Sequence, residues 1–574
     1  MTQRSLTTTH PGFQPHGNTA PLTPMSLEQL LERIDHEWHT RKRIFDLPTA
    51  RFWQPDPDID LSFEFLGRRC ASPIGPAAGP HSQLAENIVL SWLGGARLFE
   101  LKTVQILDDL EIQRPCIDMQ TIGYNIEWSQ ELTVPQSLTE YVKASMLVQI
   151  LSQWEPIQEY VGSDPGPHVF DMSVGYDLAG ISDPKVASFI RGMRDATAEI
   201  DSLRSELTGP WAQFADLDFK TSLADTLTLS TFHGCPPDEI EGITKHLIDE
   251  HDLDVIVKLN PTLLGYETVR EIVNDDLGYH DVEVKEEAFA ADLQFDRGIE
   301  LIAELNQYAA ERGRRFGIKL TNTLVVHNVK AWMPEDTMYL SGPPLHVIAM
   351  TLLDRLNPHL PEGVMVSFSA GITKDNLADS LAVGVNPATI CSDLLKPGGY
   401  GRLAPMLKAL TKEIAESGAS SLAEWKAQHA LTAGQYSARI RTSGDYHFSA
   451  NAKLPREVDH QLETFGCVAC NFCITVCPND AFFNIASPQD EIEGRQQYLV
   501  LAELCNECGN CMTFCPEDGD PAQVKPKLYT DRSVFAARTD QGFLVSDGRI
   551  VEARADTETV ETVQALLDTG SPLS

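Results

Sequence analysis

The sequence predicts an α/β protein: a (β/α)8 TIM barrel followed by a small cysteine-rich domain. Between about residues 60 and 405, eight short apolar runs rich in β-branched residues alternate with longer amphipathic helical patterns. This alternation is typical of parallel βα proteins, and eight such units are the number that closes a barrel. Further along the chain, eight of the twelve cysteines fall within residues 467–515.

The eight expected strands are short and apolar. They are Ser72–Ala78, Leu98–Thr103, His168–Val174, Thr226–Phe232, Asp254–Leu259, Phe316–Thr321, Val364–Ala370 and Ala388–Asp393. The segments between the second and third, the third and fourth, and the fifth and sixth strands are too long for one helix each. We expect them to hold extra helices or lids over the mouth of the barrel.

The other segments flank these two domains. A helix is expected to start after Ser26, which stands before an apolar pattern of helical period. Near the end of the chain, Asp547 and Gly548 indicate the turn of a hairpin that a short helix follows. The expected divisions are a lead and helix at 1–59, the barrel at 60–405, a linker at 406–455 that begins helical and ends in a polar, irregular stretch, the cysteine-rich domain at 456–525, and the hairpin and helix at 526–574.

Two copies of the pattern Cys-x2-Cys-x2-Cys-x3-Cys-Pro stand 38 positions apart. Their cysteines are, in order, Cys467, Cys470, Cys473, Cys477, Cys505, Cys508, Cys511 and Cys515. In bacterial-type 2[4Fe-4S] ferredoxins, three close thiolates of such a run bind one cluster and the fourth binds the other. Cluster one is therefore expected to take Cys515 as its fourth ligand, and cluster two Cys477. Zinc, which uses two separated cysteine pairs, is the weaker alternative.

The net charge of −37 argues against nucleic acid and anionic membranes as partners. An acidic surface suits docking onto a basic redox partner, and simple solubility explains it equally well. We find neither a secretory signal nor a run of 18 apolar residues, and the four remaining cysteines are separated singles. These features predict a cytoplasmic protein without a membrane span.

A barrel enzyme carries its chemistry at the carboxyl ends of its strands. The first strand ends in the small residues 75–80, and Lys102 and Lys258 stand at the ends of the second and fifth strands. A lysine there is unusual, because solvated lysines belong to loops and outer helices. Gly371 and Ser392 follow the last two strands, where this fold commonly binds phosphate.

The order of short motifs resembles a known family. Gly-Pro-Ala-Ala-Gly, Lys-Thr, Val-Lys-Leu, Thr-Asn-Thr and Ser-Ala-Gly-Ile, followed by twin ferredoxin runs, is similar to the C-terminal half of dihydropyrimidine dehydrogenase and, more distantly, to the dihydroorotate dehydrogenases. Residues 100–105, 123–125 and 393–400 resemble more closely the N-terminal part of the family named for selenate reductase iron–sulfur subunits. The resemblance covers residues 60 to 525 and implies a barrel of the dihydroorotate-dehydrogenase type.

The resemblance also implies FMN in the mouth of the barrel. The residues that it assigns to FMN are Ala77, Ala78 and Gly79 along the flavin ring, Lys102 and Lys258 at its N1–O2 edge and ribityl chain, and Gly371 and Ser392 at the phosphate. Asn322 and Thr323 would bind an amide-like edge of a heterocyclic substrate.

Two positions depart from the pyrimidine enzymes. Asp177 follows Tyr176 where those enzymes carry asparagine, and a carboxylate there favours a cationic or donor-rich substrate. The loop after the fourth strand resembles their loop with an acid cysteine, but its spacing is shifted by about two residues. Either Cys235 or His233 is therefore expected as the general acid, with loop packing as the non-catalytic interpretation of both.

Together these features predict a flavin and iron–sulfur oxidoreductase that acts on a small, pyrimidine- or purine-like heterocycle. The sequence has no G-x-G-x-x-G fingerprint, so we expect a separate FAD/NAD(P)H subunit or a ferredoxin as electron partner. The alternative is an electron-transfer iron–sulfur subunit of a larger complex, for example a molybdenum enzyme, with no substrate chemistry in the barrel. A scaffold with inert clusters is the third interpretation.

Overall fold

The computed structural model describes residues 22–108, 112–126, 129–231, 233–329, 333–488, 492 and 494–573. Its central unit is an eight-stranded parallel sheet. The strands are β5 (Ile74–Pro76), β6 (Leu98–Glu100), β9 (Val169–Val174), β10 (Thr226–Ser230), β11 (Asp254–Leu259), β12 (Phe316–Leu320), β15 (Met365–Phe368) and β16 (Ala388–Ile390). Each falls within one of the eight expected runs, so the predicted barrel is confirmed.

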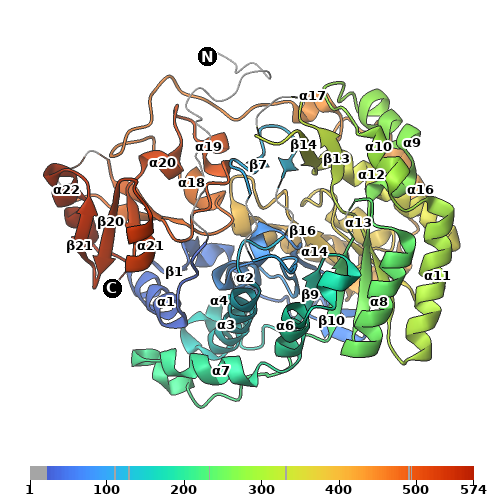
Figure 1. Cartoon of the computed structure of the whole chain (residues 1–574), viewed down its shortest axis with the longest axis horizontal. Helices are drawn as coiled ribbons and strands as arrows, with labels where there is room; N and C mark the ends of the chain where they lie inside the picture. The colour runs from blue at the N-terminus through green and yellow to red at the C-terminus, as the bar shows by residue number, and fades with distance from the viewer. Residues whose placement is uncertain are drawn as a thin grey trace.

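The strands lie in the order β5-β16-β15-β12-β11-β10-β9-β6. The two end strands meet where the Arg97 N–H donates to the Ile74 carbonyl at 3.1 Å, which nearly closes the barrel. A helix follows each strand and packs outside the sheet (Figure 1). These helices are α2 (Ala85–Leu93), α3 (Val134–Gln153), α6 (Pro184–Arg194), α8 (Pro237–His251), α11 (Phe295–Glu311), α12 (Pro343–Leu356), α13 (Leu377–Ala382) and α14 (Leu403–Ser417).

The long segments between strands carry short helices and an additional sheet. The helices are α4 (Gln158–Val161), α5 (Leu178–Ile181), α7 (Thr197–Leu203), α9 (Tyr266–Arg270) and α10 (Glu286–Ala291). The sheet has four antiparallel strands, in the order β13 (Leu324–His327), β14 (Thr337–Leu340), β8 (Tyr124–Asn125) and β7 (Ile117–Asp118). Because Tyr339 pairs with Asn125, this lid sheet joins the insertion after β6 to the one after β12.

Helix α1 (Leu27–Arg41) begins as the sequence predicts. Ser26 and Gln29 form a capping box, in which the Ser26 side chain accepts from the Gln29 N–H at 3.1 Å. The helix reaches the cysteine-rich domain through Arg33, whose guanidinium lies 2.8 Å from an oxygen of Asp480. Two small hairpins follow, formed by β1 (Arg43–Ile44) with β2 (Leu47–Pro48) and β3 (Phe63–Phe65) with β4 (Arg68–Cys70).

The segment after α14 is more helical than its polar composition indicated. It contains α15 (Leu422–Gln428), α16 (Ala433–Thr442) and α17 (Phe448–Asn451). Helix α16 packs on α12, where Tyr436 and His346 form a buried hydrogen bond of 2.9 Å. Tertiary contact with the barrel therefore stabilises helices that the local sequence pattern did not show.

The C-terminal part forms one five-stranded sheet, ordered β17 (Phe482–Ala486), β18 (Gln496–Leu501), β19 (Lys527–Tyr529), β20 (Gly542–Ser546) and β21 (Arg549–Arg554). The predicted hairpin at Asp547 and Gly548 is β20–β21. Because β19 pairs with both β18 and β20, the sheet spans the two segments that the sequence analysis separated at residue 525. The accompanying helices are α18 (Phe472–Thr475), α19 (Asn510–Phe514), α20 (Pro521–Val524), α21 (Arg532–Ala537) and α22 (Thr557–Asp568).

The cysteine-rich domain packs directly on the barrel. Pro478 O accepts hydrogen bonds from Asn87 Nδ2 at 3.0 Å and from the Tyr400 hydroxyl at 2.7 Å. At Gly399 the two domains approach so closely that an added Cβ would lie 2.0 Å from the Thr475 carbonyl oxygen. This contact accounts for the glycine in the loop after the last barrel strand.

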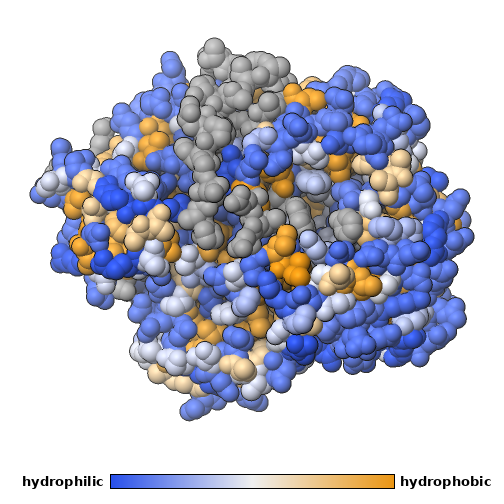
Figure 2. All heavy atoms as spheres, in the orientation of Figure 1, coloured by the Kyte–Doolittle hydropathy of each residue, from blue (hydrophilic) through white to orange (hydrophobic). Residues whose placement is uncertain are grey.

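The face drawn in Figure 2 is mostly hydrophilic, with hydrophobic residues in scattered groups. Within the part of the chain that the structure describes, we find no helix that is long and apolar enough to cross a membrane.

We predict that Gly399→Ala lowers the free energy of unfolding by about 2–4 kcal/mol, because the new methyl group collides with the Thr475 carbonyl and the backbone has φ +46°. The matched control is Gly418→Ala, which also has positive φ but nothing within 4 Å. It should cost about 1 kcal/mol. Urea-induced unfolding measures both values; equal losses would contradict the close approach.

Candidate functional site

A cavity of about 520 Å³ opens at the carboxyl ends of the barrel strands. This volume is in the range of small-molecule and cofactor sites, about 300–1,000 Å³. Every barrel strand or its following loop contributes to its lining, in order Ala77, Lys102, Gly175, Ser230, Lys258, Thr321, Ser369 and Cys391. The lid sheet adds Ile117, Tyr124, Asn125 and Tyr339. The cavity therefore has the location expected of a barrel active site.

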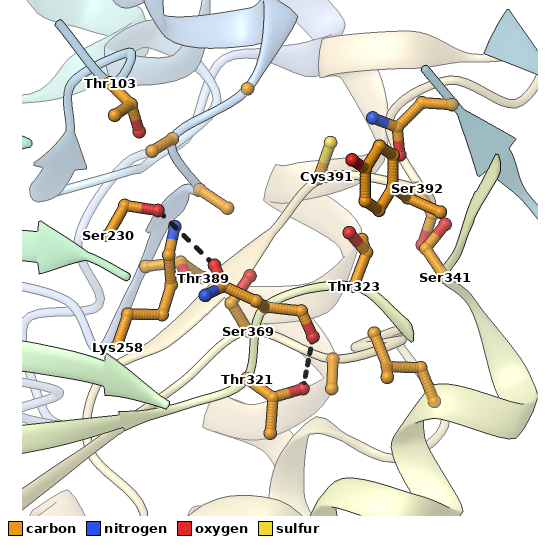
Figure 3. A pocket seen from close by; sticks show the side chains of 18 of the residues that line it. Thr103, Ser230, Lys258, Thr321, Thr323, Ser341, Ser369, Thr389, Cys391 and Ser392 are labelled. Carbon is orange, nitrogen blue, oxygen red and sulfur yellow. Dashed lines mark hydrogen bonds between the residues drawn. The ribbon is translucent and has the colours of Figure 1, made fainter. Parts of the chain in front are cut away.

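All seven residues that the sequence analysis assigned to FMN line this cavity. Figure 3 shows Lys258 and Ser230 on one side of it and Cys391 and Ser392 on the other. Gly79 approaches Cys391 closely, since an added Cβ would lie 3.0 Å from its sulfur. Gly371 has φ +56°, and an added Cβ there would lie 2.3 Å from the Gly342 carbonyl oxygen. Glycine at these two positions therefore allows the segments that form the wall to pack closely.

Buried charges surround Lys258, which lines the cavity. Glu100 lies 2.7 Å from Lys319 Nζ and 3.6 Å from Lys258 Nζ. Burial opposes ionisation of Glu100, but the two ammonium groups hold its pKa below the usual value. Burial lowers the pKa of Lys102, a second cavity-lining lysine, to about 8. Lys102 can therefore present positive charge to an anionic or electron-rich ligand below about pH 8.

The expected substrate residues also line the cavity, but their polar groups differ in availability. The Asn322 amide donates to the Thr231 carbonyl at 2.9 Å and to Asn260 Oδ1 at 2.7 Å. These bonds orient the side-chain oxygen Oδ1 of Asn322, which among the described residues accepts one long bond, of 3.4 Å, from Ser230 Oγ. The exposed Asp177 caps α5 by accepting from the Gly180 N–H at 2.8 Å, so part of its carboxylate is already engaged.

The structure distinguishes the two candidate acids. His233 lines the cavity and stacks on Tyr339, with ring centroids 6.0 Å apart. Cys235 lies behind the loop in a separate small pocket and is only 3% exposed. Burial, together with the nearby charges of Glu239 and Asp292, raises the pKa of the Cys235 thiol to about 12. His233 therefore lines the cavity at this position, whereas Cys235 does not.

Asp292 holds His233 in place, and the sequence analysis missed it. Its buried carboxylate accepts from His233 Nδ1 at 2.9 Å, from Thr262 Oγ1 at 2.6 Å, from Asn260 Nδ2 at 3.2 Å, and from the Gly234 N–H. Burial acts against the charged form, yet these donors hold the pKa of Asp292 below its usual value. In the sequence, Asp292 is an ordinary polar residue before a helix, 59 positions from His233.

The eight clustered cysteines fall into two groups of four. Cys467, Cys470, Cys473 and Cys515 line one small cavity. In the second group, burial raises the pKa of Cys511, and nearby Asp520, Cys508, Cys505 and Cys477 raise it further. Each group thus contains three close cysteines and the fourth cysteine of the other run. Four convergent thiols suit a [4Fe-4S] cluster.

The second cysteine group lies directly against the cavity wall. The Cys508 carbonyl accepts from the N–H groups of Cys116 at 3.1 Å and Ile117 at 3.0 Å. Asn510 Nδ2 donates to the Leu395 carbonyl at 2.9 Å. Because Ile117 and Leu395 line the cavity, one layer of residues separates it from this cysteine group.

Two protein-family models match parts of this chain. The family model "Oxidoreductase YgfK, N-terminal TIM-barrel domain" matches residues 45–439. The model of a 4Fe-4S dicluster domain matches residues 466–518.

Two relatives are named "Putative oxidoreductase YgfK", one from Escherichia coli K12 and one from E. coli O157:H7. Each is 40% identical over 410 residues, which cover 68% of this chain and 39% of the relative. The match thus spans about two fifths of the length of these relatives.

Among solved structures, ligand-free DHODH from Eimeria tenella covers 68% of this chain and 96% of its own, at 15% identity and a TM-score of 0.41. The same enzyme in complex with ferulenol matches at 14% identity and a TM-score of 0.40. At these scores the likeness carries no argument about function.

We predict that Asp292→Asn lowers the free energy of unfolding at pH 7 by about 2–3 kcal/mol, because the charged acceptor of four hydrogen bonds is lost. The pKa of Asp292 is depressed, so its stabilising effect exists above the unfolded pKa of about 3.9 and disappears as the pH falls through the folded value. The difference in free energy of unfolding between wild type and variant should therefore disappear at acidic pH. Urea unfolding at several pH values tests this, with the exposed Asp296→Asn as control; a gap independent of pH would be the contrary result.

Proposed function

Because the chain belongs to the YgfK oxidoreductase family, we propose that it is a flavin and iron–sulfur oxidoreductase with its substrate site in the barrel cavity. The observation that carries the proposal is the shared wall between this cavity and the 4Fe-4S dicluster domain. The Cys508 carbonyl is hydrogen-bonded to Ile117, which lines the cavity. Such closeness suits electron transfer between the two sites.

The residues present fit FMN as the cavity's cofactor. Small residues at 77–79 leave room for a flat ring, Lys102 and Lys258 offer positive charge, and Gly371 and Ser392 would supply hydrogen-bond donors to the phosphate. FMN would supply hydride exchange with the substrate and single-electron exchange with iron–sulfur clusters. The two groups of four cysteines would hold those clusters.

His233 is the residue that we propose for proton transfer to or from the substrate. Its ring is oriented by Asp292 through Nδ1, and the residue lines the cavity. A histidine positioned by a carboxylate is a frequent general acid or base in enzymes. The burial of Cys235 outside the cavity supports His233 over the cysteine.

A small heterocycle is the substrate class that the lining supports best. Asn322 presents an oriented amide oxygen, Thr323 adds a hydroxyl, and Tyr339 offers an aromatic wall. An amide-bearing ring of pyrimidine or purine type can satisfy these groups together. The exposed Asp177 at the rim favours a donor-rich edge.

Electrons would come from or go to a second redox component, either an FAD/NAD(P)H subunit or a ferredoxin. Residues 1–574 contain no dinucleotide fingerprint of their own. The cysteines outside the two runs, Cys70, Cys116, Cys235 and Cys391, are free thiols, which supports a reducing, cytoplasmic location.

An anaerobic cofactor assay tests the proposal. We expect about one FMN and about eight iron and eight acid-labile sulfide per chain, from two [4Fe-4S] clusters. Cys473→Ser should reduce iron and sulfide by about half while FMN remains bound. Eight iron without flavin would support the electron-transfer subunit instead, and a full iron content in Cys473→Ser would refute the ligand set.

We predict that FMN affinity falls as the pH rises through about 8, because Lys102 loses its positive charge near that pH. Fluorescence titration of the flavin-free protein should give a dissociation constant about tenfold higher at pH 9 than at pH 7. In Lys102→Met the affinity should be weak at pH 7 and nearly independent of pH. The control is Lys245→Met on the outer helix α8, which should behave as wild type; an unchanged pH dependence in Lys102→Met would exclude this role.

A further inference from the structure

The two cysteine groups differ in their access to solvent. Cys508 and Cys511 of the second group are buried, and this group faces the barrel cavity through its backbone. In the first group, Cys470 is exposed, and none of its four cysteines is fully buried. In Figure 1, α18 of the first run lies beside α19 of the second, and α19 lies next to β7 of the lid sheet. The first group is therefore the one that an external protein can approach.

An apolar patch borders the first cysteine group. Five large hydrophobic residues in the described ranges are exposed, and two of them, Val468 (50%) and Val458 (44%), stand here. Val468 lines the same small cavity as Cys470 and Pro516. The Val458 N–H donates to the Pro516 carbonyl at 2.7 Å, which places it at the same edge. We call Val458, Val468, Cys470 and Pro516 the port.

The charge around the port indicates the nature of its partner. Exposed carboxylates of Asp459, Glu463 and Asp518 lie on the segments that frame it, and the Leu462 N–H bonds to the Asp518 carbonyl at 2.9 Å. The exposed Lys453 and Arg456 stand earlier in the same segment, so the rim itself is mixed. The chain as a whole carries a net charge of −37. Its long-range field therefore attracts proteins with a positive docking face.

We propose that the port is the docking surface for the external electron partner, a redox protein whose own cofactor is surrounded by a positively charged rim. An apolar centre with charged surroundings is the usual anatomy of a transient interface, in which charge sets the association rate. Clusters held by the first and second cysteine groups would then connect the port to the cavity, in that spatial order and for electrons moving in either direction. This inference rests on the proposed function, because it needs clusters at both groups.

Reoxidation of the reduced holoprotein by cytochrome c, a small basic haem protein, tests the port. The protein is reduced anaerobically with dithionite, excess reductant is removed, and each electron that leaves it converts one ferric haem to ferrous haem. We expect the second-order rate constant to fall steeply as ionic strength rises past about 0.1 M. Val468→Lys should lower the rate about tenfold at low ionic strength, whereas Val468→Asp should leave it equal or higher.

The matched control is Val551→Lys on β21, because Val551 is equally exposed (52%) but lies outside the port. Its rate should stay within about twofold of wild type. Neutral 1,4-benzoquinone, which needs no docking face, should reoxidise all variants at similar rates. If Val468→Lys loses iron, Val458→Lys replaces it as the test.

Two results would contradict the proposal that the port is the docking surface. Equal slowing by Val468→Lys and Val551→Lys would show that only net charge matters, and no slowing by either would place the electron exit elsewhere. In both cases a normal iron and flavin content leaves the proposed function intact. Wild-type protein that binds no iron would instead refute the proposed function, and with it the proposal that the port is a docking surface.

Discussion

The arrangement of this protein depends on close contact between the cysteine-rich domain and the mouth of the barrel. At the cavity the contact joins backbone groups, because the Cys508 carbonyl accepts from two N–H donors at the start of the lid sheet. Further away, the Pro478 carbonyl accepts from the side chains of Asn87 and Tyr400. Bonds between backbone groups tolerate little displacement, because neither partner can change rotamer. The separation between the cavity and the second cysteine group is therefore set by the fold rather than by flexible side chains.

A second constraint is the burial of charge beneath the cavity. Glu100, Lys258 and Lys319 are almost inaccessible, and removing such groups from water is costly unless they are paired. Their mutual distances of 2.7 and 3.6 Å satisfy that requirement. The same logic applies at the rim, where Asp292 is buried and ionised only because four donors surround it. Buried ionised groups of this kind are common at functional sites.

Much of the fold was accessible from local patterns. The eight barrel strands fall within the expected runs, and the capped helix after Ser26 and the hairpin at Asp547 were predicted correctly. The lid sheet was not, because its strands have only two to four residues and two of them pair with partners far away in the sequence. The helix α16 was missed for a related reason: its stability comes from packing on α12.

The site shows the same division. The spacing of the cysteines was enough to indicate their two groups. The lysines and glycines of the cavity could be found because the carboxyl ends of barrel strands converge, so recognising the strands identifies the residues at their ends. The choice between His233 and Cys235 could not be made in this way, since neighbouring loop residues point to opposite sides of the loop. Asp292 and the contact with Cys508 were equally hidden. Both depend on loops that bring distant segments together, and no periodic pattern in the sequence predicts such contacts.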